Sequence, residues 1–141
     1  MATTRFIRFL KTAVTALLLL GAAAPAVASR APTGKPEPDI TFNLAGRTFT
    51  EKEKVRMYGD VDPAESSEVV TLHTQRYSKK DEKWKHYDMR EVDSDSDGSF
   101  SYRHPAFRKG NYRTRAEVDE TADHLAGKTR WKTMAVRRRN F

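Results

Sequence analysis

Apolar and polar residues alternate with a period of two along much of this chain from residue 40 onward. The clearest runs cover residues 40–44, 55–61 and 112–118. Successive side chains of a β-strand point to opposite faces, so the pattern predicts strands with one apolar and one polar face. A helix needs apolar residues three and four positions apart, and no window beyond the N-terminal region shows that spacing clearly. We therefore expect an all-β fold.

Seven strands are expected in all, separated by turn-forming residues such as Asp97-Gly98. They cover residues 40–44, 55–61, 70–77, 84–92, 100–102, 112–118 and 129–137. In the fourth strand, Tyr87 and Met89 are predicted to share a face. Short alternating strands with a turn about every 8–12 residues are typical of an antiparallel β-sandwich. The sequence thus predicts a single antiparallel β-sandwich of about seven strands.

The first 28 residues have the pattern of a helical secretory signal peptide. A basic start is followed by an apolar run at 13–20 and by a stretch of small residues at 21–28, with the cleavage expected after Ala28. The alternative is a retained membrane anchor. An anchor needs about 20 apolar residues, and Gly21 and Pro25 interrupt the run. We expect a secreted or cell-surface protein whose mature form has no transmembrane span.

The remaining chain divides by composition into three parts. Residues 29–39 hold three prolines and little that is apolar, so they are interpreted as an extended linker that joins no core. Residues 40–138 contain all the alternating runs and are assigned to the β-sandwich. Residues 139–141 form a basic tail.

The absence of cysteine excludes a disulfide framework, a thiolate zinc site and a cysteine nucleophile. An exported domain without disulfides must be stabilised by packing, which leaves few apolar residues to line a deep pocket. Charge is uneven as well, because residues 103–141 hold 11 basic residues against 4 acidic ones. Such a bias steers a protein toward polyanions. In a secreted protein we expect a cell-envelope polymer or an anionic lipid, and no nucleic acid.

Several short motifs accompany the predicted strands. They are Gly59–Pro63, a Val-x-Leu strand at 70–72, a strand that carries Trp84, an Asp-Gly turn before Phe100, and Tyr-Arg-x-Arg at 112–115. Together they resemble the immunoglobulin-like β-sandwich modules of secreted and surface proteins of high-GC Gram-positive bacteria. The resemblance covers residues 40–138 and implies a fold rather than an activity. One departure is His73, which stands where that family usually has Gln.

Asp93, Asp95 and Asp97, followed by Gly98, match the first half of a calcium-binding loop. Oxygen ligands at positions one, three and five with glycine at six suit that loop, but position twelve is His104 rather than glutamate. The alternative is a strand-connecting turn whose acidic side chains are solvated. These aspartates are thus candidate Ca²⁺ ligands, and no other cofactor is expected.

The four histidines, at 73, 86, 104 and 124, match no short metal motif and are interpreted as solvated side chains. Hydrolase motifs such as Gly-x-Ser-x-Gly and His-Glu-x-x-His are also missing from the sequence. A triad assembled by the fold alone stays open, because such triads are recognised by geometry. The sequence favours a protein without catalytic activity.

A basic and aromatic face is predicted from the last two long strands. If Met134 points inward, Trp131 shares the outer face with Arg113 and Arg115, and the three residues become candidates for binding a glycan or an anionic polymer. The alternative is that Trp131 covers a sheet edge and the arginines keep the sheet soluble. Trp84 is predicted to fill the core.

These features predict a secreted, non-catalytic binding or structural module that contacts the cell envelope or an anionic polymer. The alternative is a secreted effector or protease-inhibitor-like protein that binds another extracellular protein through the loop at 119–128. Tyr112 is expected to anchor its strand through its hydroxyl rather than to touch a ligand.

Overall fold

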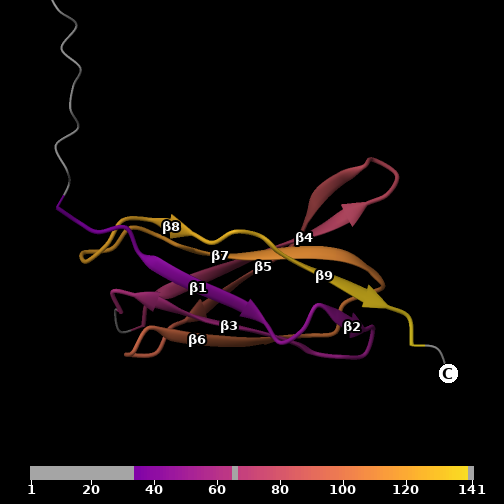
Figure 1. The fold of residues 1–141 in the computed structure, drawn as a ribbon, viewed down its shortest axis with the longest axis horizontal. Coiled ribbons are helices and arrows are strands. Elements are labelled where there is room, and N and C mark those ends of the chain that lie inside the picture. The colour runs from indigo at the N-terminus through magenta and orange to yellow at the C-terminus, as the bar shows by residue number, and fades with distance from the viewer. Residues whose placement is uncertain (1–33, 65–66, 140–141) are drawn as a thin grey trace, which may run out of the picture. The chain divides into compact units, whose positions relative to one another are not determined.

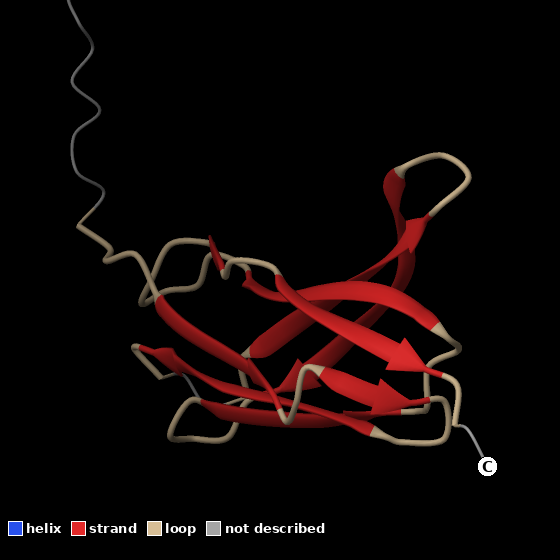
Figure 2. Cartoon of the chain, turned by 45° about the vertical axis from the view of Figure 1, so that its right-hand side comes forward, coloured by secondary structure: helices blue, strands red, loops and turns tan. Residues whose placement is uncertain are grey.

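A computed structural model describes residues 34–64 and 67–139, which form nine β-strands and no helix (Figures 1 and 2). The strands are β1 (Asp39–Leu44), β2 (Thr48–Thr50), β3 (Val55–Asp62), β4 (Val69–Ser78), β5 (Lys83–Asp93), β6 (Ser99–His104), β7 (Gly110–Val118), β8 (Gly127–Lys128) and β9 (Lys132–Arg137). The prediction of an all-β fold is therefore confirmed. The expected signal peptide, residues 1–28, lies outside the described residues. Within them, the structure has no helix with the length and apolarity needed to cross a membrane.

The strands form two sheets. Sheet A has the order β1-β3-β6 and is antiparallel throughout. Sheet B has the order β2-β9-β7-β4-β5. The two-residue strand β8 is not part of this order and pairs with the end of β7. All seven predicted strands are present, although the last one begins at Lys132 rather than at Thr129.

The prediction of a purely antiparallel arrangement of about seven strands is corrected by β2, which runs parallel to β9. After β1 the chain leaves sheet A and continues as a three-residue strand at the edge of sheet B. Phe49, the middle residue of β2, is buried in the core and holds the segment there. A strand with one apolar residue is too short to show alternation, so its sequence carries no strand pattern.

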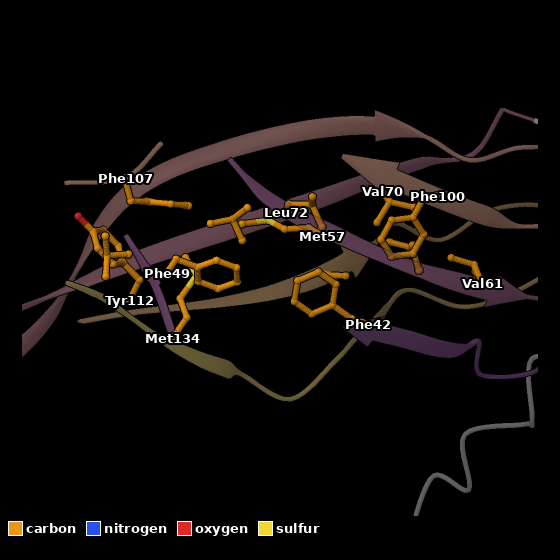
Figure 3. Close-up of a cluster of buried hydrophobic side chains, with 14 residues drawn as sticks. Phe42, Phe49, Met57, Val61, Val70, Leu72, Phe100, Phe107, Tyr112 and Met134 are labelled. Carbon is orange, nitrogen blue, oxygen red and sulfur yellow. The ribbon is translucent and has the colours of Figure 1, made fainter. Parts of the chain in front are cut away.

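One hydrophobic core lies between the two sheets and takes side chains from both (Figure 3). In β3, every second residue from Val55 onward is buried, as the alternation predicts. Phe42 and Met57 of sheet A and Leu72 of sheet B all belong to this core. Each fully buried side chain of this size contributes about 1.5–3 kcal/mol by leaving water. Packing of this kind stabilises a chain that has no cysteine.

Tyr112 anchors the start of β7, as the sequence predicts. Its ring is fully buried and packs against Phe107 and Tyr87, with centroid distances of 4.7 and 5.0 Å. Its hydroxyl donates a hydrogen bond of 2.7 Å to the carbonyl oxygen of Arg108. Burial raises the pKa of Tyr112 to about 12, because the charged phenolate would lose its hydration.

A β-bulge in β5 overturns the predicted faces of that strand. Thr74 pairs with Asp88 and Gln75 pairs with His86, so Tyr87 is the extra residue. Tyr87 packs against the core, whereas Met89 is 50% exposed. The two side chains therefore do not share a face, because an extra residue interrupts the alternation.

The segment that was expected to be a linker contributes to the fold from residue 34 onward. The carbonyl oxygen of Pro36 accepts a hydrogen bond from the Leu125 amide at 3.0 Å. Lys35 forms an ion pair of 2.7 Å with Glu120. Pro38 packs so closely on Gly127 that a Cβ at Gly127 would lie 2.5 Å from the Pro38 ring. Residues 34–38 therefore pack on the 120–127 segment, and β1 begins directly after them.

Candidate binding face

The outer face of sheet B carries the aromatic and basic side chains that the sequence pattern predicts for it. Tyr112 pairs with Met134 and both are buried, so the neighbouring pair Arg113 and Thr133 points away from the core. Trp131 directly precedes β9 and faces the same way as Thr133. The structure thus brings Arg113, Arg115 and Trp131 together, and their role in binding stays a prediction.

The planar groups form a continuous stack on this face. The Arg113 guanidinium carbon lies 4.5 Å from the centroid of the Trp131 ring and 4.7 Å from that of Trp84. The Arg115 guanidinium carbon lies 4.4 Å from the Trp131 centroid. All three contacts are within the range of cation–π attraction. We call the stack of Trp84, Arg113, Trp131 and Arg115 the outer-face strip.

Trp84 was predicted to fill the core, and the structure shows instead that it belongs to the outer-face strip. It is half-buried and meets Tyr77 edge-on, with their ring centroids 5.3 Å apart. The bulge at Tyr87 lies between Trp84 and the core-facing part of the strand. A residue-by-residue alternation could not place Trp84 correctly without knowledge of that bulge.

Neighbouring polar groups hold both arginines of the strip in place. The Arg113 Nε donates a hydrogen bond of 2.8 Å to the Gln75 side chain. Arg115 forms an ion pair with Glu117, which also lies 3.0 Å from His73 Nε2. These contacts pre-organise the strip and neutralise part of the Arg115 charge.

Two shallow hollows flank the outer-face strip. One, of about 350 Å³, is lined by Trp84, and the other, of about 380 Å³, by Trp131. Arg47 and Thr133 line both hollows. The sequence prediction missed Arg47 because it lies between β1 and β2, where the residues do not alternate. Its carbonyl oxygen accepts a hydrogen bond of 2.9 Å from Ala135, which places Arg47 beside β9.

Of the aspartates that are candidate calcium ligands, Asp93 ends β5, whereas Asp95 and Asp97 lie in the β5–β6 connection, where the described contacts are those of a turn. Asp97 accepts hydrogen bonds from the Ser99 amide and hydroxyl at 2.9 and 2.6 Å, which lower the pKa of Asp97. Gly98 has a φ of +83° and donates to the Asp95 carbonyl oxygen at 2.9 Å. Among the described residues, no group of three or more His, Asp or Glu side chains is placed to hold a metal ion. The structure therefore does not gather Asp93, Asp95 and Asp97 into a binding cage.

The interpretation of all four histidines as solvated is wrong for His104 and His124, which are buried. In each, Nδ1 contacts the carbonyl oxygen of the next residue, and Nε2 contacts a carboxylate. The partner of His104 is Asp88 at 2.8 Å, and the partner of His124 is Glu68 at 2.7 Å. His73 is half-buried and only His86 of the four is exposed. Since both carboxylates lie far away in sequence, spacing could not reveal these pairs.

Asp88 connects β5 to sheet A through His104. Burial alone would raise the pKa of Asp88, but the hydrogen bonds with His104 and Arg90 outweigh it and lower that pKa. The Arg90 Nε donates to Asp88 at 2.8 Å. His104 also stacks on Phe107, with ring centroids 3.9 Å apart and planes 11° from parallel.

The loop at 119–128, a candidate recognition loop, is held at several points. His124 is fully buried, and its amide and that of Asp123 donate to the Thr121 hydroxyl. The loop ends in β8, which pairs with the end of β7. Its backbone is thus fixed, whereas Glu120 and Asp123 are exposed.

A scan against models of known protein families finds no match, and a search of curated proteins finds no similar sequence.

Proposed function

We propose that this protein is an exported, non-catalytic binding module with an immunoglobulin-like β-sandwich fold. It contacts an anionic polymer of the cell envelope through the outer-face strip. The proposal combines the architecture with one surface feature, the stack of two indole rings and two guanidinium groups on sheet B.

The strand order supports the immunoglobulin-like assignment. Such domains place their strands A, B and E in one sheet and C, F and G in the other. Here β1, β3 and β6 form sheet A, while β4, β7 and β9 lie together in sheet B, with β5 in the position of an added C′ strand. A tyrosine near the start of strand F that bonds back to the backbone is a further mark of this fold. The bond from Tyr112 to Arg108 has that form.

The observation that carries the binding proposal is the position of Trp131 between two guanidinium groups. Because guanidinium groups lie over the Trp131 ring, the surface offered to a sugar ring or another planar group is the half-buried strip as a whole, which Trp131 holds together. Arg113 and Arg115 supply positive charge at 4.5 and 4.4 Å from the ring. Because neighbouring side chains hold both arginines, a ligand would bind without ordering them first. The positive bias of residues 103–141 favours an anionic partner.

The test is binding of the protein to purified cell envelopes from a Gram-positive bacterium. Trp131→Ala is expected to reduce the bound fraction several-fold, and added salt is expected to weaken binding of the parent protein. Tyr58→Ala is the matched control, since Tyr58 is a 38% exposed aromatic residue of sheet A. Thermal unfolding verifies that both variants are folded. Equal binding by Trp131→Ala and the parent protein would overturn the proposal.

The second candidate is an effector that binds one extracellular protein through the loop at 119–128. It is favoured by the buried contact between Glu68 and His124, which holds the loop in one conformation while Glu120 stays exposed. Affinity capture from culture medium separates the two functions. Recovery of one discrete protein, lost on Glu120→Ala and retained on Trp131→Ala, would favour the effector.

A further inference from the structure

A cleft of about 710 Å³ lies beside the hairpin formed by β4 and β5. The tip of this hairpin projects beyond the two sheets (Figures 1 and 2). The cleft is lined by the outer end of the hairpin, by the start of β7 and by the end of β9. It shares no residue with the outer-face strip.

The lining of the cleft is strongly basic. Six cationic side chains line it: Arg76, Lys79, Lys80, Lys85, Lys109 and Arg137. Among the described residues, no aspartate or glutamate is part of the lining. Like charges gathered in a concave surface raise the local potential above that of the same charges on a flat surface, and so attract anions.

Most of these charges are available to a ligand. Lys85 forms an ion pair with Asp81 on the hairpin. In the part of the chain that the structure describes, no carboxylate forms an ion pair with Lys79, Lys80, Lys109 or Arg137. Cations without carboxylate partners can bind an external anion without first breaking an ion pair.

Arg76 gives the cleft a fixed cationic group beside the start of β7. Its Nη2 donates a hydrogen bond of 2.7 Å to the Lys109 carbonyl oxygen, and its guanidinium carbon lies 5.7 Å from the Tyr112 ring centroid. Gly110 permits this packing, because a Cβ there would lie 3.0 Å from the Arg76 Nε. The guanidinium group retains donors for an anion after making its bond to the backbone.

Two aromatic residues, Tyr77 and Tyr87, also line the cleft. Tyr87 is held against Phe107 and Tyr112, and Tyr77 against Trp84, so both rings are fixed. Carbohydrate rings present apolar C–H faces that pack on aromatic surfaces, and their acidic substituents pair with cations. A lining that combines fixed rings with unpaired lysines suits a ligand that carries both features.

We propose that this cleft binds an anionic glycan, a carbohydrate chain whose sugar units carry carboxylate groups. The site goes beyond the proposed function, because none of its lining residues belongs to the outer-face strip, although Tyr77 packs on Trp84 at the boundary between the two. The lysines at the hairpin tip and Arg76 pair with the carboxylates, while the tyrosine rings contact the sugars.

The experiment measures the affinity of the folded protein for a fluorescently labelled oligogalacturonate by anisotropy. Lys79→Ala/Lys80→Ala is expected to weaken binding about three- to tenfold, the loss of two partly screened ion pairs. The matched control is Arg103→Ala/Lys128→Ala, which removes the same charge from exposed positions on β6 and β8, outside the cleft. The control is expected to retain most of the affinity, and thermal unfolding verifies that all variants are folded.

Two further probes test the chemistry of the ligand. Neutral dextran of the same length is expected to bind at least tenfold more weakly than oligogalacturonate, because it lacks carboxylates. Inorganic polyphosphate has charge but no sugar ring, and tighter binding of polyphosphate would overturn the assignment to a glycan. Equal losses in the hairpin and control variants would overturn the site itself. Trp131→Ala reports separately on the outer-face strip, so that failure of one proposal is distinguishable from failure of the other.

Discussion

Replacing Glu68 by alanine is expected to destabilise the fold by about 3–5 kcal/mol, because the change leaves His124 buried without its carboxylate. The Glu68 and His124 side chains are 3% and 0% exposed, and the His124 Nε2 lies 2.7 Å from the carboxylate. The other ring nitrogen, Nδ1, contacts the Leu125 carbonyl oxygen at 2.7 Å. Both ring nitrogens therefore face oxygen atoms.

A carbonyl oxygen and a carboxylate oxygen lie against the two ring nitrogens, so the His124 ring has a polar partner on each side. Water cannot replace the missing carboxylate at a side chain that is fully buried. The contact also connects the loop that carries His124 to the segment before β4. Its loss therefore removes both a polar partner and a tertiary connection.

The assay is guanidinium chloride denaturation followed by circular dichroism, applied to the parent, Glu68→Ala, His124→Ala and the double variant. A loss of 3 kcal/mol corresponds to a melting temperature lower by at least about 12 °C in a domain of roughly 100 residues. The double variant is expected to be more stable than the sum of the single losses predicts, because the two residues interact directly. Glu120→Ala, which removes the exposed partner of Lys35 from the same loop, is expected to have little effect. Small, additive losses in the single variants would refute the argument.

Three further predictions concern stability, each followed by chemical denaturation. Tyr112→Phe is expected to cost about 0.5–1.5 kcal/mol, because the part-buried hydrogen bond from its hydroxyl to the Arg108 carbonyl oxygen is lost. The lowered pKa of Asp88 means that its stabilising contribution is complete above about pH 4, the unfolded-state value, and is lost as the pH falls through the folded-state value. Asp88→Asn should therefore flatten the fall in stability between about pH 5 and 2, and an unchanged slope would show that the Asp88 carboxylate is not responsible for it. Gly59→Ala should cost about 3 kcal/mol or more, since a Cβ would collide with the Thr41 backbone oxygen; a fully stable variant would contradict this packing.

Part of the candidate site can be predicted from the sequence, because it depends only on which side chains of a strand point to the same face. Arg113 and Arg115 alternate with buried neighbours along β7, and the inward direction of Met134 places Trp131 on the outer face. Trp84 was misplaced because the bulge at Tyr87 interrupts the alternation of its strand. A bulge depends on which strand lies alongside, and the sequence of one strand does not contain that information.

The cleft is a site that local sequence patterns cannot predict. The cleft joins Arg76 and Lys80 of the hairpin region to Lys109 and Arg137, which come from other parts of the chain. Each of these residues appears in the sequence as an ordinary surface cation. The pairing of β4 with β7 and of β7 with β9 brings them together at the base of the hairpin that projects beyond the sheets (Figure 2).

The all-β class, the positions of the long strands and the anchoring role of Tyr112 can all be predicted from the residues alone. Alternation at a period of two is a property of the local backbone, so it can be recognised without knowing the partner strand. Three features follow only from the folded arrangement: β2 joins sheet B, Trp84 faces outward, and His124 contacts Glu68. Each of these features depends on contacts between segments that are distant in sequence. Such contacts stabilise the protein only after the two sheets have packed on their common core.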